Sequence, residues 1–245
     1  MAYTIVNSYI PTSLYPLKAP YTMTPEYITI HNTNNDATAA NEIAYMARNT
    51  TVVGYHVAID DKQAIQAIPF TRNAFHSGDG QGAGNRKSIG IEICYSKSGG
   101  PKYVAAEENT VEYVAHVLKQ YGWGIDRVRT HKSWTEIGMK TGASKYIKNC
   151  PHRILDEKRL QSFLNRIAKR LAELNNPPQQ IVEVEGKIDE MAEQLPKTQQ
   201  DDMRALLKRA HNEKVFSVNH TSKVETMTRG QATDLLISYV ARTAK

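Results

Sequence analysis

Four short segments in the first half of the chain alternate apolar and polar positions with the two-residue period of β-strands. They are rich in β-branched and aromatic residues, and they cover residues 27–32, 55–60, 64–70 and 88–95. A further strand is predicted over 127–131, directly after the glycine-containing turn 122–124.

Apolar residues between and after these strands recur at the three- and four-residue spacing of helices. Asp36 or Thr38 predicts the start of the first helix, and Asp156 predicts the start of the last one. The glycine-rich segment 79–85 predicts a loop. Strands interleaved with helices predict an α/β domain in which helices flank a mixed central β-sheet. The helical stripes comprise Ala40, Ile43 and Ala44, then Val111, Val114, Ala115 and Leu118, and finally Leu160, Phe163, Leu164, Ile167 and Leu171.

Two consecutive prolines, Pro177 and Pro178, mark a break in the chain, because they cannot continue a helix and their neighbours are polar. We therefore expect a first domain over 1–174, a linker over 175–182 and a second domain over 183–245. Apolar stripes after the linker, with a helix cap at Thr228, predict that the second domain is small and mainly helical. The stripes comprise Met203, Leu206, Leu207 and Ala210, followed by Ala232, Leu235, Leu236, Tyr239 and Val240.

Positive charge is concentrated in the first part of the chain. The 245 residues have a formal net charge of +6, and all of it falls on residues 1–180. A pI near 9.1 suggests nucleic acid, anionic lipid or an anionic polymer as partner, although a basic surface also serves solubility alone. No run of Lys and Arg with interleaved aromatic residues occurs, so we expect no nucleic acid partner.

The compartment is indicated by what the sequence lacks. No apolar run approaches the roughly 18 residues of a spanning helix, so we expect no membrane insertion. The first twenty residues have neither a basic start nor a continuous apolar stretch, so we expect no signal peptide. Two cysteines cannot form a disulfide framework, which favours synthesis in a reducing cytosol.

Three residues are candidates for metal binding: His31 at the end of the segment 27–32, His131 at the end of 127–131, and Cys150. Histidines at the ends of neighbouring strands can point into one cleft, and two imidazoles with a thiolate suit zinc. Their spacing matches no compact zinc-finger pattern, however. The residues alone therefore leave open whether each histidine is a ligand or an ordinary structural residue.

Longer stretches of the chain resemble a known family. Residues 1 to about 168 resemble the zinc-dependent N-acetylmuramoyl-L-alanine amidases of the amidase-2 family, which share a fold with phage T7-type lysozyme and peptidoglycan recognition proteins. The resemblance is strongest to Bacillus-type phage and prophage endolysins. It rests on the collinear stretches PYTMTPEYITIHNTNNDA, YHVAIDDKQAIQAIP, RNAFHSGDGQGAGNRKSIGIEICYSKSGG, VRTHKSW and KNCPHRIL.

This resemblance implies a metal centre in which His31, His131 and Cys150 bind one Zn²⁺ ion per catalytic domain. A zinc ion with an open position lowers the pKa of water bound there to about 7, which makes a nucleophile available at neutral pH. Many relatives have Asp in place of the cysteine.

The resemblance also implies catalytic and substrate-binding residues. Glu92 matches a general base, although a strand carboxylate facing solvent is the alternative. Lys148 matches a lysine that supports the transition state, and Tyr55 matches a tyrosine at the rim of the site that some close relatives replace with Phe. His76 lies where relatives line the substrate groove. The segment 135–149 is longer than in the close relatives, which predicts a lid, a substrate-contacting loop or an extended surface loop.

The implied activity is hydrolysis of the amide bond between N-acetylmuramic acid and L-alanine in peptidoglycan, as in a phage endolysin made in the host cytoplasm and acting at the wall after release. A bacterial autolysin of the same family and a non-catalytic peptidoglycan recognition protein are the alternatives. For the tail, 183–245, the resemblance implies a cell-wall-binding domain, with a secondary wall polymer as a further candidate ligand. The helical stripes could equally serve a homodimer.

Overall fold

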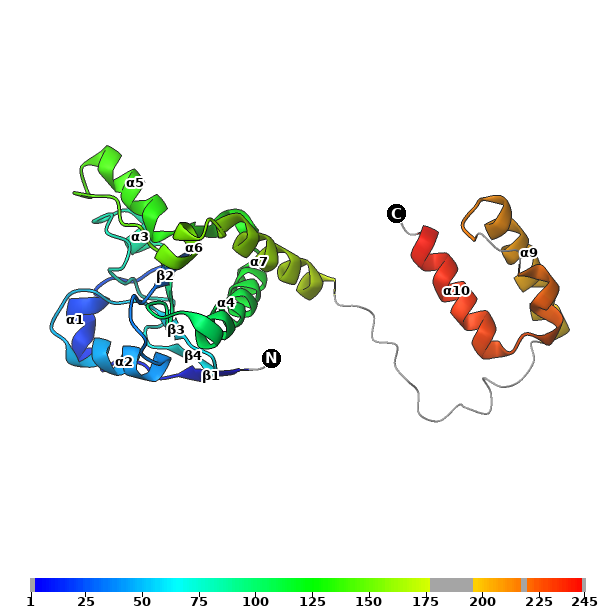
Figure 1. The fold of residues 1–245 in the computed structure, drawn as a ribbon, viewed down its shortest axis with the longest axis horizontal. Helices are drawn as coiled ribbons and strands as arrows, with labels where there is room; N and C mark the ends of the chain where they lie inside the picture. The colour runs from blue at the N-terminus through cyan, green and yellow to red at the C-terminus, as the bar shows by residue number, and fades with distance from the viewer. Residues whose placement is uncertain (1–2, 177–195, 217–219, 244–245) are drawn as a thin grey trace. The chain divides into compact units, whose positions relative to one another are not determined.

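The computed structural model describes residues 3–176, 196–216 and 220–243 (Figure 1). These residues belong to two compact units, Met1–Pro178 and Gln179–Lys245. Most of the expected linker, 175–182, lies outside the described residues.

The first unit is built on a six-stranded sheet with the strand order β1-β4-β3-β5-β2-β6. Only β3 and β4 pair antiparallel, and the other neighbours run parallel, so the expectation of a mixed sheet flanked by helices is confirmed. The edge strand β1 has no counterpart among the predicted strands, since all four of its residues are exposed. The strands are β1 Thr4–Asn7, β2 Tyr27–Asn32, β3 Val57–Ile59, β4 Gln63–Gln66, β5 Ser88–Ile93 and β6 Val128–Thr130.

The neighbouring strands β2 and β5 show why this sequence forms a two-faced sheet. Their register pairs His31 with Glu92, so these two side chains leave the same face of the sheet. Polar and small residues occupy that face in both strands. The opposite face carries a row of isoleucines that are 0–1% exposed and form the centre of the core: Ile28, Ile30, Ile89, Ile91 and Ile93.

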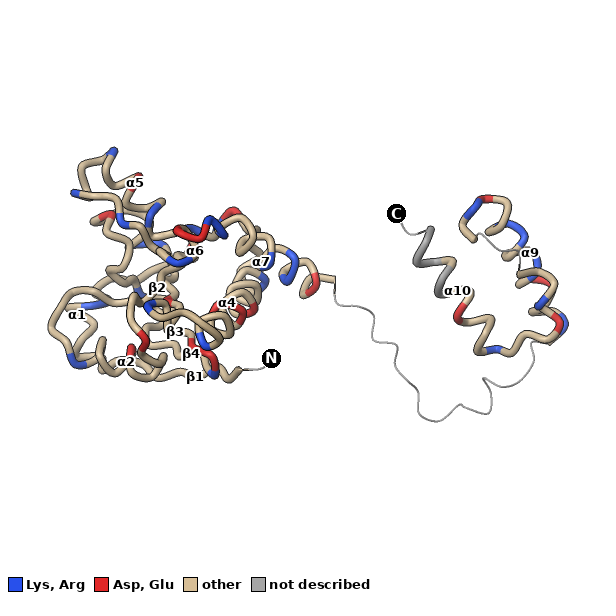
Figure 2. Tube along the Cα trace, in the orientation of Figure 1, with Lys and Arg blue, Asp and Glu red and all other residues tan. Residues whose placement is uncertain are grey.

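Helices flank this sheet, and the longest one, α4, contacts β3, β4 and β5 and packs against α7. Figure 2 shows acidic segments of α4 beside basic segments of α7. The buried carboxylate of Glu107 accepts hydrogen bonds from Arg159, at 2.7 and 3.1 Å, and from Arg166. The helices are α1 Tyr15–Lys18, α2 Ala39–Arg48, α3 Ala83–Arg86, α4 Gly100–Tyr121, α5 His131–Thr141, α6 His152–Asp156 and α7 Leu160–Asn175, with short 3-10 turns η1 Thr12–Leu14 and η2 Ile125–Arg127.

The structure decides where the two expected helices begin. Thr38 caps α2, because its hydroxyl accepts a hydrogen bond from the backbone of Asn41, whereas Asp36 instead accepts from Ser98. The expectation that Asp156 begins the last helix is wrong, because α6 ends there and α7 begins at Leu160. Between them Lys158 has a left-handed backbone with φ of 55°, which interrupts the helix.

Three predicted segments have different bounds in the structure. The expected strand over 127–131 is shorter, because Thr130 caps α5 in a reciprocal pair of bonds with Ser133, which makes His131 the first helical residue. The predicted loop 79–85 runs into the short helix α3. Of the segment 135–149, residues 135–141 complete α5 and residues 142–149 form a loop.

The second unit is mainly helical, as expected. Its described residues form α9 Lys197–Asn212, η3 Thr221–Thr226 and α10 Arg229–Thr243. The hydroxyl of Thr228 accepts a hydrogen bond from Gln231, as expected for a cap. None of the described helices is both long and apolar enough to cross a membrane. A small core forms from Met203, Leu207, Ala210, Phe216, Val224, Met227 and Ala232; the side chain of Val240 lies outside the described residues.

Candidate active site and metal centre

Three elements bring His31, His131 and Cys150 together. His31 is the fifth residue of β2, His131 is the first residue of α5, and Cys150 lies in the loop before α6. His31 Nδ1 lies 3.1 Å from His131 Nδ1 and 3.7 Å from Cys150 Sγ. The ligand atoms of all three residues lie within 4.8 Å of one another, so the group can hold a metal ion.

The separations between these atoms can be compared with those of a zinc site. A tetrahedral zinc ion with Zn–N bonds of about 2.0–2.1 Å and a Zn–S bond of about 2.3 Å separates two nitrogen ligands by about 3.3 Å and a nitrogen from a sulfur by about 3.6 Å. The observed 3.1 and 3.7 Å are close to these values. Two imidazoles and one thiolate are a donor set that suits zinc in chemistry, and ligand atoms within 4.8 Å of one another can share one metal ion.

Burial determines the protonation of the three residues. It lowers the pKa of His31 well below its ordinary value, helped by the nearby His131, His76 and Lys148, and it lowers the pKa of His131 to about 4. Both imidazoles are therefore neutral at pH 7 and offer lone pairs. Burial raises the pKa of the Cys150 thiol to about 12, so metal binding there has to displace a proton.

The three residues line a cleft of about 710 Å³. Its charged residues are Glu92, Lys145 and Lys148. The net charge of this lining is positive whether Glu92 is protonated or ionised, because two lysines face one carboxyl group. Residues 52–53 and the loop 142–149 both contribute to the border of the cleft. The full lining is His31, Asn32, Val52, Val53, Phe75, His76, Gly78, Gly80, Gln81, Asn85, Glu92, His131, Thr135, Ala143, Ser144, Lys145, Tyr146, Lys148 and Cys150.

Glu92 stands on β5 directly beside His31 and points into this cleft rather than to open solvent. Burial, reinforced by the negative charge of Glu42 and opposed by Lys148, raises the pKa of Glu92 to about 8. Its Oε2 has no hydrogen-bond partner among the described residues. A carboxyl group with these properties can take and release a proton near neutral pH.

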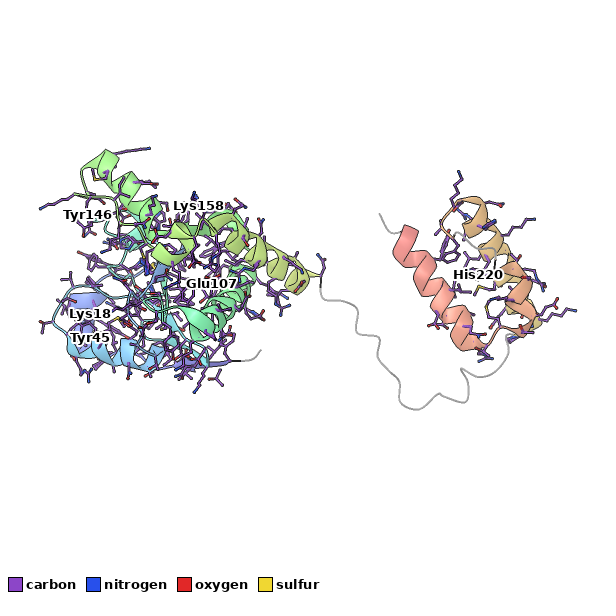
Figure 3. The ribbon with its side chains drawn as sticks, in the orientation of Figure 1. Lys18, Tyr45, Glu107, Tyr146, Lys158 and His220 are labelled. Carbon is purple, nitrogen blue, oxygen red and sulfur yellow. The ribbon has the colours of Figure 1, made fainter. Side chains whose placement is uncertain are left out.

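The loop 142–149 is fastened to its surroundings at both ends. Ser144 Oγ donates a 2.5 Å hydrogen bond to the carbonyl of Gly78, and the backbone N–H of Lys148 donates to Thr135 Oγ1 at 2.9 Å. The exposed Lys148 is held beside the cleft by this second bond. Tyr146, which is 65% exposed, lies beside α5 (Figure 3). Of the expected forms of the longer segment, the structure shows a helix end followed by an anchored loop.

Tyr55 is placed differently from the rim position that was expected. Its side chain is buried, and its hydroxyl donates a 3.3 Å hydrogen bond to Glu42 Oε2. It does not belong to the cleft lining. Burial, followed by the charges of Glu92 and Glu42, raises its pKa above the ordinary value. A direct role of Tyr55 in catalysis stays a prediction.

His76 belongs to the cleft lining, but it is only 6% exposed, and its ring meets the His31 ring edge to face. His31 Nε2 and His76 Nδ1 lie 3.0 Å apart. Contact with substrate stays a prediction, while contact with a metal-binding candidate is observed.

Sequence reasoning missed Lys18, which is 0% exposed. Its ammonium donates to Asn49 Oδ1 and to the carbonyls of Thr51 and Val53 at 2.8–3.1 Å. It therefore holds the segment that borders the cleft. A lysine is ordinarily exposed, so no feature of the sequence pattern could have identified this role.

Comparison with known proteins agrees with this geometry. Residues 21–153 match the family model described as N-acetylmuramoyl-L-alanine amidase. Over 175 residues the chain is 53% identical to the N-acetylmuramoyl-L-alanine amidase CwlA of Bacillus subtilis strain 168. This match covers 71% of this chain and 60% of the length of CwlA.

Solved structures show the same fold for the first unit. The structure of PlyL is 49% identical, with a TM-score of 0.62, and the match covers 68% of this chain and 98% of PlyL. A mutant endolysin from Bacillus subtilis is 34% identical, with a TM-score of 0.57, and the match covers 67% of this chain and 99% of that chain. The fold, the matched residues and the site together show that the chain belongs to the N-acetylmuramoyl-L-alanine amidase family.

Proposed function

We propose that this protein is a zinc-dependent N-acetylmuramoyl-L-alanine amidase that hydrolyses the amide bond between N-acetylmuramic acid and L-alanine in bacterial peptidoglycan. The observation that carries the proposal is the convergence of His31, His131 and Cys150 in a cleft that also contains Glu92. Membership of the amidase family supports the bond that is cleaved.

His31, His131 and Cys150 would hold the zinc ion. When bound, zinc supplies a water activated at neutral pH and a positive charge that polarises the scissile carbonyl. Glu92, unpartnered at Oε2 among the described residues, accepts a proton from the attacking water and delivers it to the leaving amine of L-alanine. The Lys148 ammonium stabilises the negative charge that develops on the carbonyl oxygen.

The charge of the cleft supports an anionic substrate. Lys145 and Lys148 are its cationic side chains, and Glu92 is its single carboxyl group. Peptidoglycan stem peptides carry carboxylates, so a positive cleft attracts them. The exposed apolar side chains of Val52, Val53 and Tyr146 offer contact surface for the sugar or for aliphatic parts of the peptide.

The test is digestion of purified Bacillus peptidoglycan by the full chain, with product masses measured with and without a chelator. We expect free stem peptides that begin with L-alanine, intact glycan strands, and loss of both signals with chelator until zinc is restored. Cut sugar linkages or cut cross-bridges would contradict the bond assignment. Binding to walls without any cleavage would favour the non-catalytic recognition protein instead.

We infer that the protein works as an endolysin, acting at the cell wall after release from the host cytoplasm. The likeness of the first unit to an endolysin structure supports this inference. Expression of the full chain inside Bacillus cells should leave them intact until a pore-forming holin is co-expressed, and then the culture should clear. Lysis by the chain alone would favour the autolysin alternative.

We also propose that the expected second domain, 183–245, binds the cell wall, with a secondary wall polymer as a candidate ligand. A groove of about 530 Å³ supports this role and includes Met203, Leu206, Ala232 and Leu236 among its lining residues. Tethering a wall-binding unit to an enzyme raises the local substrate concentration without a new contact in the active site.

A pair of full-length variants tests the groove. Leu236→Asp places a charge in it, whereas Ala205→Asp places the same charge on an exposed position of α9 outside the groove. We expect Leu236→Asp to reduce sedimentation with intact walls, and Ala205→Asp to behave as the parent. Equal binding by both variants would argue against the groove. Light scattering on the parent decides whether the full chain forms a homodimer.

A further inference from the structure

His76 contacts the metal-binding candidate His31 on the side away from the other two candidates. His31 uses its Nδ1 to face His131 and Cys150, and its Nε2 lies 3.0 Å from His76 Nδ1. The two rings meet edge to face, with centroids 5.1 Å apart. His76 is therefore a neighbour of the proposed metal site. Its Nδ1 faces His31 and not the position that His31, His131 and Cys150 share.

The other nitrogen of His76 fixes which tautomer the ring adopts. His76 Nε2 lies 3.2 Å from the backbone carbonyl of Ser88, and a carbonyl can only accept. Nε2 therefore carries the hydrogen. With the hydrogen on Nε2, the other ring nitrogen, Nδ1, is the acceptor, and His31 Nε2 lies 3.0 Å from it. The hydroxyl of Ser77, 2.9 Å away, can donate to the same nitrogen.

This assignment determines the tautomer of His31. Because His76 Nδ1 accepts, His31 Nε2 has to donate, and the neutral His31 ring then has its lone pair on Nδ1. We propose that His76 is a positioning residue that holds His31 in the Nε2–H tautomer and so presents Nδ1 as the metal ligand. The chain of bonds runs from the carbonyl of Ser88 on β5 through His76 to His31 on β2. The proposal rests on the metal role of His31 in the proposed function.

The packing and hydrogen bonds around His76 hold its ring in one orientation. A Cβ at position 90 would lie 2.8–2.9 Å from three atoms of the His76 ring, so only glycine leaves room for the ring against β5. The backbone N–H groups of His76 and Ser77 both donate to Asn85 Oδ1, at 2.8 and 2.7 Å. The ring is thus held from its own backbone, from its face and from both nitrogens, as a partner that orients a ligand requires.

Zinc affinity measured by competition with a chelating dye tests the proposal on the full chain. His76→Leu removes the acceptor, and we expect the dissociation constant to rise about 10–100-fold, the usual effect of losing such a partner. His76→Asn keeps an amide oxygen near the position of Nδ1 and should restore most of the affinity. His116→Leu, a matched control on α4 whose ring bonds to Glu112, should bind zinc as the parent does.

The same variants separate positioning from substrate contact. A substrate-contacting His76 would leave zinc affinity unchanged in His76→Leu and raise only KM for peptidoglycan, which would overturn the proposal. Zinc binding is measured without substrate, so a parent that binds zinc but cleaves nothing would refute the proposed function and leave this proposal intact.

A second measurement does not depend on how the variants fold. Nitrogen-15 NMR of the imidazoles in the metal-free parent should show His31 and His76 both protonated at Nε2. Nδ1 protonation of either ring would overturn the proposal.

Discussion

Strands β2 and β5 present two faces of very different chemistry. One face is a row of buried isoleucines, and the other carries His31 and Glu92 together with small polar residues. Successive residues of a strand point to opposite faces, so the same few residues serve the core and the site alternately. A residue of the core and a residue of the site are therefore direct neighbours in the sequence, as Ile91 and Glu92 are.

The largest effect is expected on the polar side, at the metal ligands. Cys150→Ala should abolish stoichiometric zinc binding and reduce amidase activity by more than the roughly 10–100-fold that the loss of a ligand's partner costs. Metal content by mass spectrometry and product release check both. The control is Cys94→Ala, which should retain zinc. Cys94 directly follows β5, is buried and does not belong to the cleft lining. Zinc retained by Cys150→Ala would refute the ligand assignment.

Glu92→Gln should reduce kcat by about 10²–10⁴-fold, because the amide cannot relay a proton. The free energy of unfolding should not fall, since the carboxylate atom Oε2 has no partner among the described residues to lose. Turnover measurements check the expected fall in kcat, and urea unfolding of the same preparation checks the free energy of unfolding. A variant that keeps full turnover would remove the proton-relay role.

Ile91→Ala, one residue earlier and on the other face, should show the reverse behaviour. We expect the free energy of unfolding to fall by about 2–5 kcal/mol, because a fully buried side chain leaves a cavity. Zinc affinity of the folded fraction should stay near that of the parent. If zinc affinity fell in parallel with stability, the two faces would not be separable as described.

The smallest expected effect lies outside the sheet, at Glu107. Burial alone would raise its pKa, but the hydrogen bonds from Arg159 and Arg166 overcome this and hold the pKa below the ordinary value. The carboxylate therefore contributes stability above the unfolded-state pKa of about 4.3, and this contribution is lost as the pH falls through the folded-state pKa.

Glu107→Gln should consequently lower the free energy of unfolding at pH 7 by about 1–3 kcal/mol, less than for a fully buried pair because both arginines are about one-third exposed. The difference from the parent should shrink below pH 4. Urea unfolding at a series of pH values checks this, and an equal difference at all pH values would contradict it. Activity per folded molecule should not change.

The strands that build the site could be predicted from the sequence, and the contacts across the site could not. The alternation in YITIHN and SIGIEI predicts β2 and β5 and places Glu92 opposite its isoleucine neighbours. The joint position of His31, His131 and Cys150 came from the resemblance, because residues a hundred positions apart have no periodic signal that links them.

Two kinds of physical cause limit what the sequence pattern can show. Asp156 looked like a helix start because aspartate is a good cap, but the left-handed backbone at Lys158 sets the break later. The positions of Tyr55 and His76 depend on tertiary contacts, with Glu42 in one case and His31 in the other. Such contacts are settled by how helices and loops pack on the sheet, which local patterns do not encode.

The buried ammonium of Lys18 has a consequence for how this enzyme family can change over time. It holds the segment that borders the cleft partly through the carbonyls of Thr51 and Val53, which every residue type possesses. The side chains of Val52 and Val53 are more than half exposed and take no part in this attachment. Mutations at positions 52 and 53 can therefore alter the surface that this segment offers to a ligand in the cleft while its backbone keeps its course, so the chemistry of this border can change at little cost to folding.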